Sequence, residues 1–135
     1  MSTLPLNNQS IYHYELRVDD DVFLKKLKLA SAGVIFNAIE KDRKHLDKWL
    51  PFVRNTWRVE DSETFIKSVI NSHCHKKDMV FEIWYLDAFA GLIALKEIDK
   101  WNRRTELGYW IISEYEGKGI VSRSCRLLID ILDDE

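Results

Sequence analysis

The 135-residue sequence predicts an α+β fold with three layers, in which helices flank a mostly antiparallel central sheet. Two periodicities carry this prediction. Several short segments alternate apolar and polar residues, as half-buried strands do, whereas others space apolar residues three and four positions apart, as amphipathic helices do. A glycine-containing turn also joins a strand-like run to a helical one within residues 105–122. The predicted order is β-β-α-α-β-β-β-α, in a single domain spanning residues 1–135.

The chain begins with a predicted hairpin. Residues 11–18 are a mostly alternating run of apolar and polar side chains, and the apolar pattern resumes over residues 22–29. Between them lie three consecutive aspartates at 19–21, a residue type that favours turns. This pattern indicates two antiparallel strands joined by an acidic turn.

A helix, or a pair of helices, is expected after the hairpin. Ser31 can cap its first turn, and the apolar positions that follow keep near-helical spacing as far as Leu46. The helical region should end near Leu50, because Pro51 disfavours helix in the residue before it.

Residues 51–58 are expected to form a loop, and another helix follows it. Asp61 or Ser62 can cap this helix. Its predicted buried face holds four apolar residues, Phe65, Ile66, Val69 and Ile70.

Three strands are predicted next. Residues 80–86 are aromatic and β-branched, residues 87–91 contain turn formers, and residues 92–98 return, which indicates a second hairpin. Residues 105–112 form the last predicted strand, which runs into a glycine turn.

Gly117 and Gly119 in this turn predict an anion site. The first four N–H groups of a helix lack intrahelical partners, and the macrodipole adds roughly half a positive charge there. Glycines let the chain turn sharply and let a phosphate approach the backbone. Many such turns bind nothing, but a core helix with two apolar stripes follows this one. The stripes are Val121, Cys125, Leu128 and Leu132, and Ile120, Ser124, Leu127 and Ile131.

The composition argues against several classes of partner. Twenty basic and 22 acidic residues leave a formal charge of −2, so neither nucleic acid nor an anionic membrane is an expected partner. No apolar run approaches the roughly 20 residues that span a bilayer, and residues 1–9 lack the features of a signal peptide. We therefore expect a cytoplasmic protein whose two cysteines, Cys74 and Cys125, are reduced.

Three segments together resemble the GCN5-related N-acetyltransferase (GNAT) superfamily, and in particular its RimJ/RimL-type branch of ribosomal-protein N-terminal acetyltransferases. They are His-Leu-Asp-Lys-Trp-Leu-Pro at 45–51, Asn-Arg-Arg-Thr-Glu-Leu-Gly-Tyr-Trp-Ile at 102–111 and Glu-Gly-Lys-Gly-Ile-Val-Ser at 116–122. The resemblance extends over residues 11–132, and the combination is far more specific than any one segment.

The resemblance implies transfer of an acetyl group from acetyl-CoA to a primary amine, on a small molecule or a protein N-terminus, without a metal. It places the CoA pyrophosphate on the glycine turn and the pantetheine arm along the preceding strand. The residues so matched are Trp110, Ile111, Ile112 and Ser113 on the strand side, and Glu116, Gly117, Lys118, Gly119, Ile120, Val121 and Ser122 at the turn. Lys118 would add a positive charge beside the phosphates. In one departure, Glu114 occupies the first position of the Gln/Arg-x-x-Gly-x-Gly/Ala pattern.

Glu106 is the candidate catalytic residue, since related enzymes often use a glutamate of this strand to accept the proton of the amine. The alternative is a structural carboxylate that pairs with Arg103 or Arg104. The oxyanion donor would be a backbone N–H near Ile111 or Ile112.

The aromatic and nucleophilic residues elsewhere in the chain are weaker candidates for the functional site. Three aromatic residues match the acceptor side of the family: Trp49, Phe52 and Trp57. Only Trp49 is favoured as a substrate-binding residue, and core packing is the alternative role for all three. His45 could be a base but is more simply a surface group. His73, Cys74 and His75 are consecutive, so they cannot close on one metal ion from a helix. The apolar position of Cys125 should raise its pKa and hide it, which argues against a covalent intermediate.

The family normally continues beyond the last helix, so the resemblance implies a GNAT-like sheet truncated after the helix that follows its fourth core strand. We expect the unpaired edge to promote homo-oligomers. Three explanations for this difference from the family are open: truncation, a degenerate gene, or completion by another chain. A catalytically silent fragment that binds CoA or a protein partner is the main alternative function, and an unrelated nucleotide-binding module is a weaker one.

Overall fold

A computed structural model describes residues 9–72, 78–99 and 101–134 of the chain. Its strands are β1 (Glu15–Arg17), β2 (Val22–Lys26), β3 (Met79–Tyr85), β4 (Ala88–Asp99) and β5 (Arg104–Ile111). Its α-helices are α1 (Ala32–Lys41), α2 (Arg43–Leu46), α3 (Val59–Ser72) and α4 (Ile120–Asp134). Short 3-10 helices lie at η2 (Leu29–Ser31), η3 (Pro51–Asn55) and η5 (Ser113–Tyr115). The predicted element order is confirmed.

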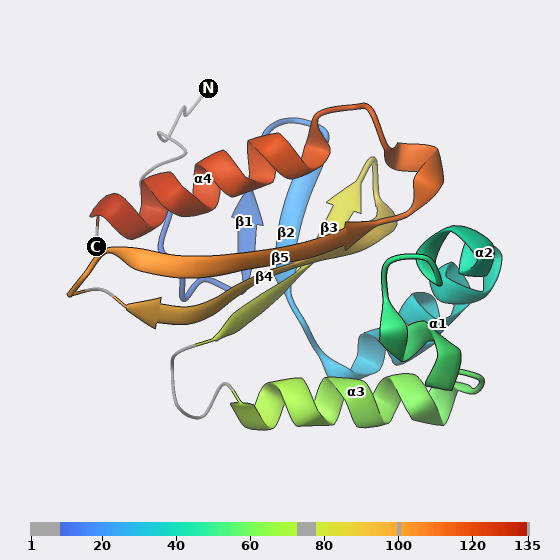
Figure 1. Ribbon diagram of the computed structural model, residues 1–135. Coiled ribbons are helices and arrows are strands. Elements are labelled where there is room, and N and C mark those ends of the chain that lie inside the picture. Colours follow the sequence, from blue (N-terminus) through green and yellow to red (C-terminus); the bar gives the residue numbers. More distant parts are fainter. Residues whose placement is uncertain (1–8, 73–77, 100, 135) are drawn as a thin grey trace.

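The five strands form one antiparallel sheet in the order β1-β2-β3-β4-β5, so each strand lies beside its neighbour in sequence. Helix α4 lies over one face of the sheet, and α1 and α3 lie on the other side (Figure 1). This arrangement confirms the predicted α+β class and its three layers. Among the described residues, no helix is both long and apolar enough to cross a membrane.

Each face of the sheet has its own hydrophobic core. Under α4, the fully buried side chains include Leu16, Leu24, Phe81, Ile83, Ile93, Leu95, Ile120, Leu128 and Ile131. Under α1 and α3, they include Ile35, Ile39, Val53 and Ile66, which pack with Leu92 and Trp110 of the sheet. Alternation along β4 and β5 sends successive side chains to the two cores. Ile111 therefore faces α4, while its neighbour Trp110 faces the other layer.

The two hairpins differ from the predicted ones in their extents. Strand β1 is only three residues long, shorter than the predicted run of residues 11–18. The turn between β3 and β4 consists of Leu86 and Asp87, both with positive φ (48° and 64°), so β4 begins at residue 88. A two-residue turn with positive φ matches the twist of a hairpin. Gly91 consequently lies inside a strand and not in the predicted turn.

The predicted helix ends need correction. Ser31 is buried and its side chain makes no capping hydrogen bond to α1. Helix α3 begins at Val59, earlier than expected, and Asp61 caps it from within the first turn. The Asp61 carboxylate accepts hydrogen bonds from the amides of Trp57 (2.8 Å) and Arg58 (3.0 Å). Ile70, predicted to be buried, is 39% exposed because it lies toward the solvent side of α3.

Candidate active site

The glycine turn has the backbone conformation that an anion site requires. Gly117 and Gly119 have φ values of +79° and +73°, in the left-handed region that L side chains rarely adopt. The hydrogen bond from the Arg123 amide to the Gly119 carbonyl (3.0 Å) starts the ladder of α4. Within the described part of the chain, the amides of Gly117, Lys118 and Gly119 have no hydrogen-bond acceptor. These donors, with those of the first helical turn, are available to a ligand.

A pocket of about 280 Å³ opens beside this turn. Seven of the predicted cofactor residues line it, namely Ile111, Glu116, Gly117, Gly119, Ile120, Val121 and Ser122. Tyr109 and Tyr115 also line it, although the sequence reasoning missed them. Tyr109 could have been found, because it shares a strand face with Ile111. Burial raises the pKa of Tyr115, helped by the negative charge of Glu114, so its phenol stays protonated at neutral pH.

The other predicted strand residues are placed differently. Trp110 faces the α1 and α3 layer, where its ring meets that of Phe89 edge to face at 5.9 Å. The Ile112 amide donates to the Ala90 carbonyl (2.8 Å), and the Ser113 amide donates to the Asp42 carboxylate (2.8 Å). The Ser113 hydroxyl contacts the same carboxylate at 2.5 Å. These amides are therefore occupied within the protein.

Strand β5 has one free edge in the described sheet, because it pairs only with β4. The bond between Ile112 and Ala90 fixes which residues face that edge. Backbone groups alternate along an antiparallel strand, so those of Trp110 point toward β4 and those of Tyr109 and Ile111 point away from it. Of the two oxyanion donors considered, Ile112 is engaged, and the Ile111 N–H remains as the candidate.

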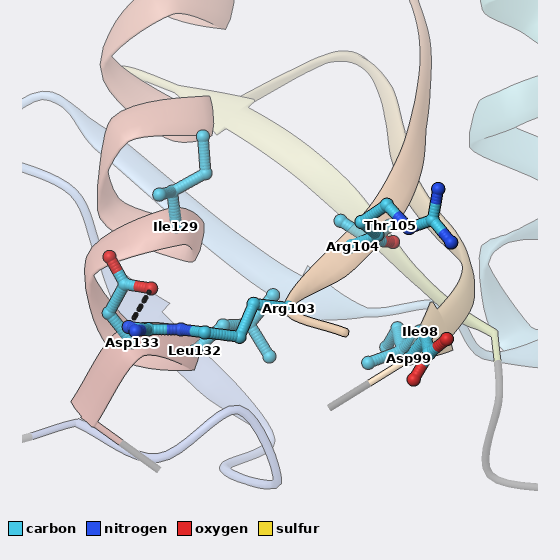
Figure 2. A pocket seen from close by; sticks show the side chains of 8 residues that line it. All are labelled: Ile98, Asp99, Arg103, Arg104, Thr105, Ile129, Leu132 and Asp133. Atoms are coloured by element: carbon cyan, nitrogen blue, oxygen red, sulfur yellow. Dashed lines mark hydrogen bonds and ion pairs between the residues drawn. The ribbon is translucent and has the colours of Figure 1, made fainter. Parts of the chain in front are cut away.

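Another pocket lies toward the other end of β5. It has a volume of about 240 Å³ and lies between the β4–β5 hairpin and the end of α4 (Figure 2). Ile129 and Leu132 of α4 supply apolar surface there. Arg103 crosses the pocket to Asp133, with a separation of 3.1 Å between the charged groups. Strand β5 thus has a pocket near each of its ends.

Glu106 is exposed on β5, opposite Lys96 in the strand register. Its side chain has no hydrogen bond or ion pair with any described residue, and Arg103 pairs instead with Asp133. The proposed structural pairing with the neighbouring arginines is thus not formed. By alternation with Trp110, Glu106 faces the α1 and α3 layer, whereas the glycine-turn pocket lies on the α4 side.

The two acidic residues near the glycine turn, Glu114 and Glu116, line different pockets. Glu114 lines a different pocket, together with Lys41 and Trp84, and does not line the glycine-turn pocket. Its departure from the family pattern therefore does not place a carboxylate in that pocket. Glu116 does line the turn pocket, and its carboxylate lies 3.3 Å from the His45 Nε2 atom. His45 thus contacts the turn from the end of α2.

Trp49 is 72% exposed just beyond α2, so core packing does not account for it. The nearby loop is organised by Arg43, whose guanidinium donates to the carbonyls of Val53 (2.8 Å) and Thr56 (2.5 Å). Arg43 also lies over the Trp57 ring, 4.1 Å from its centroid. Phe52 stacks on Phe65 with centroids 5.3 Å apart.

The thiol of Cys125 is partly buried on α4, and burial raises its pKa, as expected. His73, Cys74 and His75 lie outside the described residues. Among the residues that are described, no group of three or more His, Cys, Asp or Glu side chains could hold a metal ion.

Comparison with known proteins assigns the family. The profile of the acetyltransferase (GNAT) domain matches residues 21–135. The chain is 29% identical over 123 residues to the putative ribosomal N-acetyltransferase YdaF of Bacillus subtilis (strain 168), covering 90% of this chain and 67% of YdaF. It is 25% identical over 114 residues to the ribosomal-protein-serine acetyltransferase of Escherichia coli (strain K12), covering 84% of this chain and 64% of that protein.

A solved structure also matches. The microcin C7 self-immunity acetyltransferase MccE, in complex with acetyl-CoA and AMP, superposes with a TM-score of 0.81 at 26% identity, over 93% of this chain and 69% of MccE. The chain thus spans about two thirds of the length of these relatives. With 115 of its 135 residues matched by the family profile (21 to 135), this chain belongs to the acetyltransferase (GNAT) domain family.

Proposed function

We propose that this chain binds acetyl-CoA between the glycine turn and the free edge of β5, and transfers the acetyl group to a primary amine. One observation carries the proposal. The unbonded amides of Gly117, Lys118 and Gly119 belong to a turn that lines a pocket, and Ile111 at the free strand edge lines the same pocket. Such a turn suits a diphosphate, and an open strand edge suits the amide groups of a pantetheine arm.

In the proposed reaction, the neutral amine attacks the thioester carbonyl carbon. The Ile111 N–H would stabilise the negative charge that develops on the carbonyl oxygen. The carbon–sulfur bond then breaks, CoA leaves as a thiolate that takes up a proton, and the amine nitrogen loses its proton to a base. We assign Glu106 as that base, acting through water, because no described side chain engages its carboxylate.

We infer that the amine enters from the α1 and α3 layer, where Glu106 and the exposed Trp49 lie. An acceptor with an extended apolar or cationic part could stack on Trp49. The two sequence relatives are named as ribosomal acetyltransferases, which makes a protein N-terminus the first acceptor to test. Acetyl-CoA and ribosomal proteins meet in the cytoplasm, where we place the reaction.

Self-association completes the proposal. Leu107 (39% exposed), Tyr109 (56%) and Ile129 (50%) present apolar surface beside the unpaired edge of β5. A second copy of the chain offers the same edge, so two copies can pair through a symmetric contact while acetyl-CoA does not occupy that edge.

Calorimetric titration with acetyl-CoA tests binding, and mass spectrometry of acetylated products tests transfer. The acceptor panel would contain a peptide with a free N-terminus, a polyamine, an amino acid and an aminoglycoside. Saturable binding with a product mass gain supports the proposal. Binding without any product would favour the catalytically silent alternative, and absence of binding would contradict the proposal altogether.

The assignment of Glu106 has its own test. Glu106→Gln should lower kcat by about 10²-fold or more, because the amide can no longer accept the proton of the amine. Its acetyl-CoA affinity should remain close to that of wild type. Glu63→Gln on α3 is the matched control and should change neither quantity. An unchanged kcat in Glu106→Gln would exclude this carboxylate as the base.

A further inference from the structure

Arg123, in the first turn of α4, reaches back to the glycine turn. Its Nη2 atom donates to the Lys118 carbonyl (3.1 Å) and its Nε atom to the Gly119 carbonyl (3.3 Å). Its remaining guanidinium nitrogen, Nη1, pairs with the Asp19 carboxylate. One planar group thus holds two consecutive carbonyls of the turn and an acid from a distant segment.

These contacts determine where the neighbouring amides point. In a trans peptide unit, the C=O and the following N–H lie on opposite sides of the bond. Holding the Lys118 and Gly119 carbonyls on the guanidinium therefore directs the N–H groups of Gly119 and Ile120 away from it. Gly119 and Ile120 both line the glycine-turn pocket.

Asp19 connects this arrangement to the sheet. Its Oδ1 atom accepts hydrogen bonds from the amides of Asp21 and Val22, each at 2.8 Å, in the turn between β1 and β2. Its Oδ2 atom is the one that pairs with Arg123. Val22 is completely buried, so the hairpin that carries Asp19 is firmly placed. Glycine turns are intrinsically free to adopt many conformations, and this pair ties the turn to a fixed strand.

We propose that Asp19 and Arg123 are positioning residues that hold the glycine turn in the conformation that binds the CoA pyrophosphate. The proposal rests on acetyl-CoA being the ligand, as proposed above. It differs from a direct role, in which Arg123 would itself contact a phosphate. In a direct role, Asp19 would compete with the phosphate for the guanidinium, and its removal would strengthen binding. In a positioning role, its removal weakens binding.

The affinities for two ligands, acetyl-CoA and S-acetylpantetheine, distinguish the positioning role from the direct role. Asp19→Asn keeps the Oδ1 acceptor of the hairpin turn but loses the charge that pairs with Arg123. We expect Asp19→Asn and Arg123→Gln each to weaken acetyl-CoA binding about tenfold, and the double variant to be no weaker than Arg123→Gln, because both act through one contact. Binding of S-acetylpantetheine, which lacks the pyrophosphate, should stay within about twofold of wild type for all three.

Asp20→Asn, in the same acidic turn, and Arg126→Gln, on the exposed side of α4, are the matched controls and should leave both affinities unchanged. Tighter acetyl-CoA binding by Asp19→Asn would overturn the proposal in favour of direct contact. Unchanged affinity would also overturn it, as would an equal loss for both ligands, which indicates a general loss of structure.

A measurement on the ligand-free chain distinguishes the positioning role of Asp19 and Arg123 from the proposed function. Amide relaxation by NMR should give Gly119 an order parameter near the rigid value of about 0.85 in wild type and below about 0.6 in Arg123→Gln. If Gly119 loses order in Arg123→Gln but the wild-type chain binds no acetyl-CoA, the proposed function is contradicted. The positioning role of Asp19 and Arg123 in the turn would then still stand. An equally ordered turn in Arg123→Gln would overturn the positioning role, whatever the chain binds.

Discussion

Gly91 shows how a single residue can control the strand that lines the candidate site. An ideal Cβ at this position would lie 2.1 Å from the Trp110 carbonyl oxygen and 2.9 Å from the Ile111 Cα. Both are backbone atoms of β5, so the side chain could not be accommodated by a rotamer change. The absence of a side chain at residue 91 therefore permits the close approach of β4 and β5.

Gly91→Ala should lower the free energy of unfolding by about 1–3 kcal/mol, because the two strands must separate to admit the methyl group. It should also weaken acetyl-CoA binding, since Ile111 moves with β5. Urea denaturation measures the first effect. Gly108→Ala is the control, as its Cβ would meet only the flexible end of Lys96 at 3.9 Å. Equal stability losses in the two variants would contradict this explanation.

Asp61 predicts a pH dependence at the start of α3. The hydrogen bond from the Trp57 amide is the main cause that lowers the pKa of Asp61 below its ordinary 3.8, and burial opposes it. A carboxylate with a lowered pKa stabilises the fold fully above its unfolded pKa, and this stabilisation is lost as the pH falls through the folded pKa.

Asp61→Asn should therefore have a lower urea midpoint than wild type near neutral pH. The gap should be constant down to about pH 5 and narrow below 3.8, as the pH falls from the ordinary pKa of the unfolded carboxyl toward the lowered pKa of the folded one. Denaturation series at several pH values measure the gap, with Glu63→Gln as the control for charge on the same helix. A gap that stays constant to pH 3 would exclude the ionised cap.

In the proposed complex, the backbone of the turn between η5 and α4 would bind the phosphates. Gly119→Ala places a side chain at φ +73°, a conformation that costs an L residue roughly 1–2 kcal/mol. We expect about tenfold weaker acetyl-CoA binding, because the turn relaxes to a conformation with other amide directions. Gly33→Ala, in α1 with nothing near its Cβ, should bind normally and be slightly more stable. Normal acetyl-CoA binding by Gly119→Ala would show that this conformation is not needed.

Sequence periodicity predicted most elements, because alternation and helical spacing report which side chains are buried. It predicted the two stripes of α4, of which Ile120, Ser124, Leu127, Leu128 and Ile131 are buried. It predicted Asp61 as a cap of α3 but missed the start of that helix at Val59, and it missed Gly91 as a strand residue, since each depends on where an element begins. The link between Asp19 and Arg123 joins residues 104 positions apart, and no local pattern contains that information.

In the candidate site too, local sequence patterns predicted some features, and contacts between distant segments determined the rest. The glycine turn was predictable because positive φ leaves a glycine signature. The engagement of the Ile112 and Ser113 amides was not, since it depends on the register with β4 and on Asp42 from another layer. Only the family resemblance favoured Trp49 as a substrate-binding residue over core packing, because aromatic residues look alike in sequence whether they pack or face solvent.

For the whole molecule, the unpaired edge of β5 predicts association between copies. Light scattering at tens of micromolar should give a mass above that of one chain, because the edge and its apolar neighbours exclude water when paired. Leu107→Lys combined with Ile129→Lys should return the chain to a monomer by placing charge on that surface. A monomeric wild type would contradict the predicted association.

The two layers of helices have distinct parts in the proposed reaction. Helix α4 and its turn, which would hold the phosphates, lie on one side of the sheet, and α1, α2 and η3 border the other side, where Glu106 lies. The acyl donor and the amine would thus approach β5 from opposite faces and meet at its edge.

We propose that the backbone amides of the glycine turn bind the diphosphate of acetyl-CoA. The most direct measurement follows the amide resonances of Gly117 and Gly119 by NMR during titration. We predict large, saturable shifts with acetyl-CoA and no comparable shifts with S-acetylpantetheine, which lacks the diphosphate. Resonances that stay in place at saturating acetyl-CoA would contradict the claim.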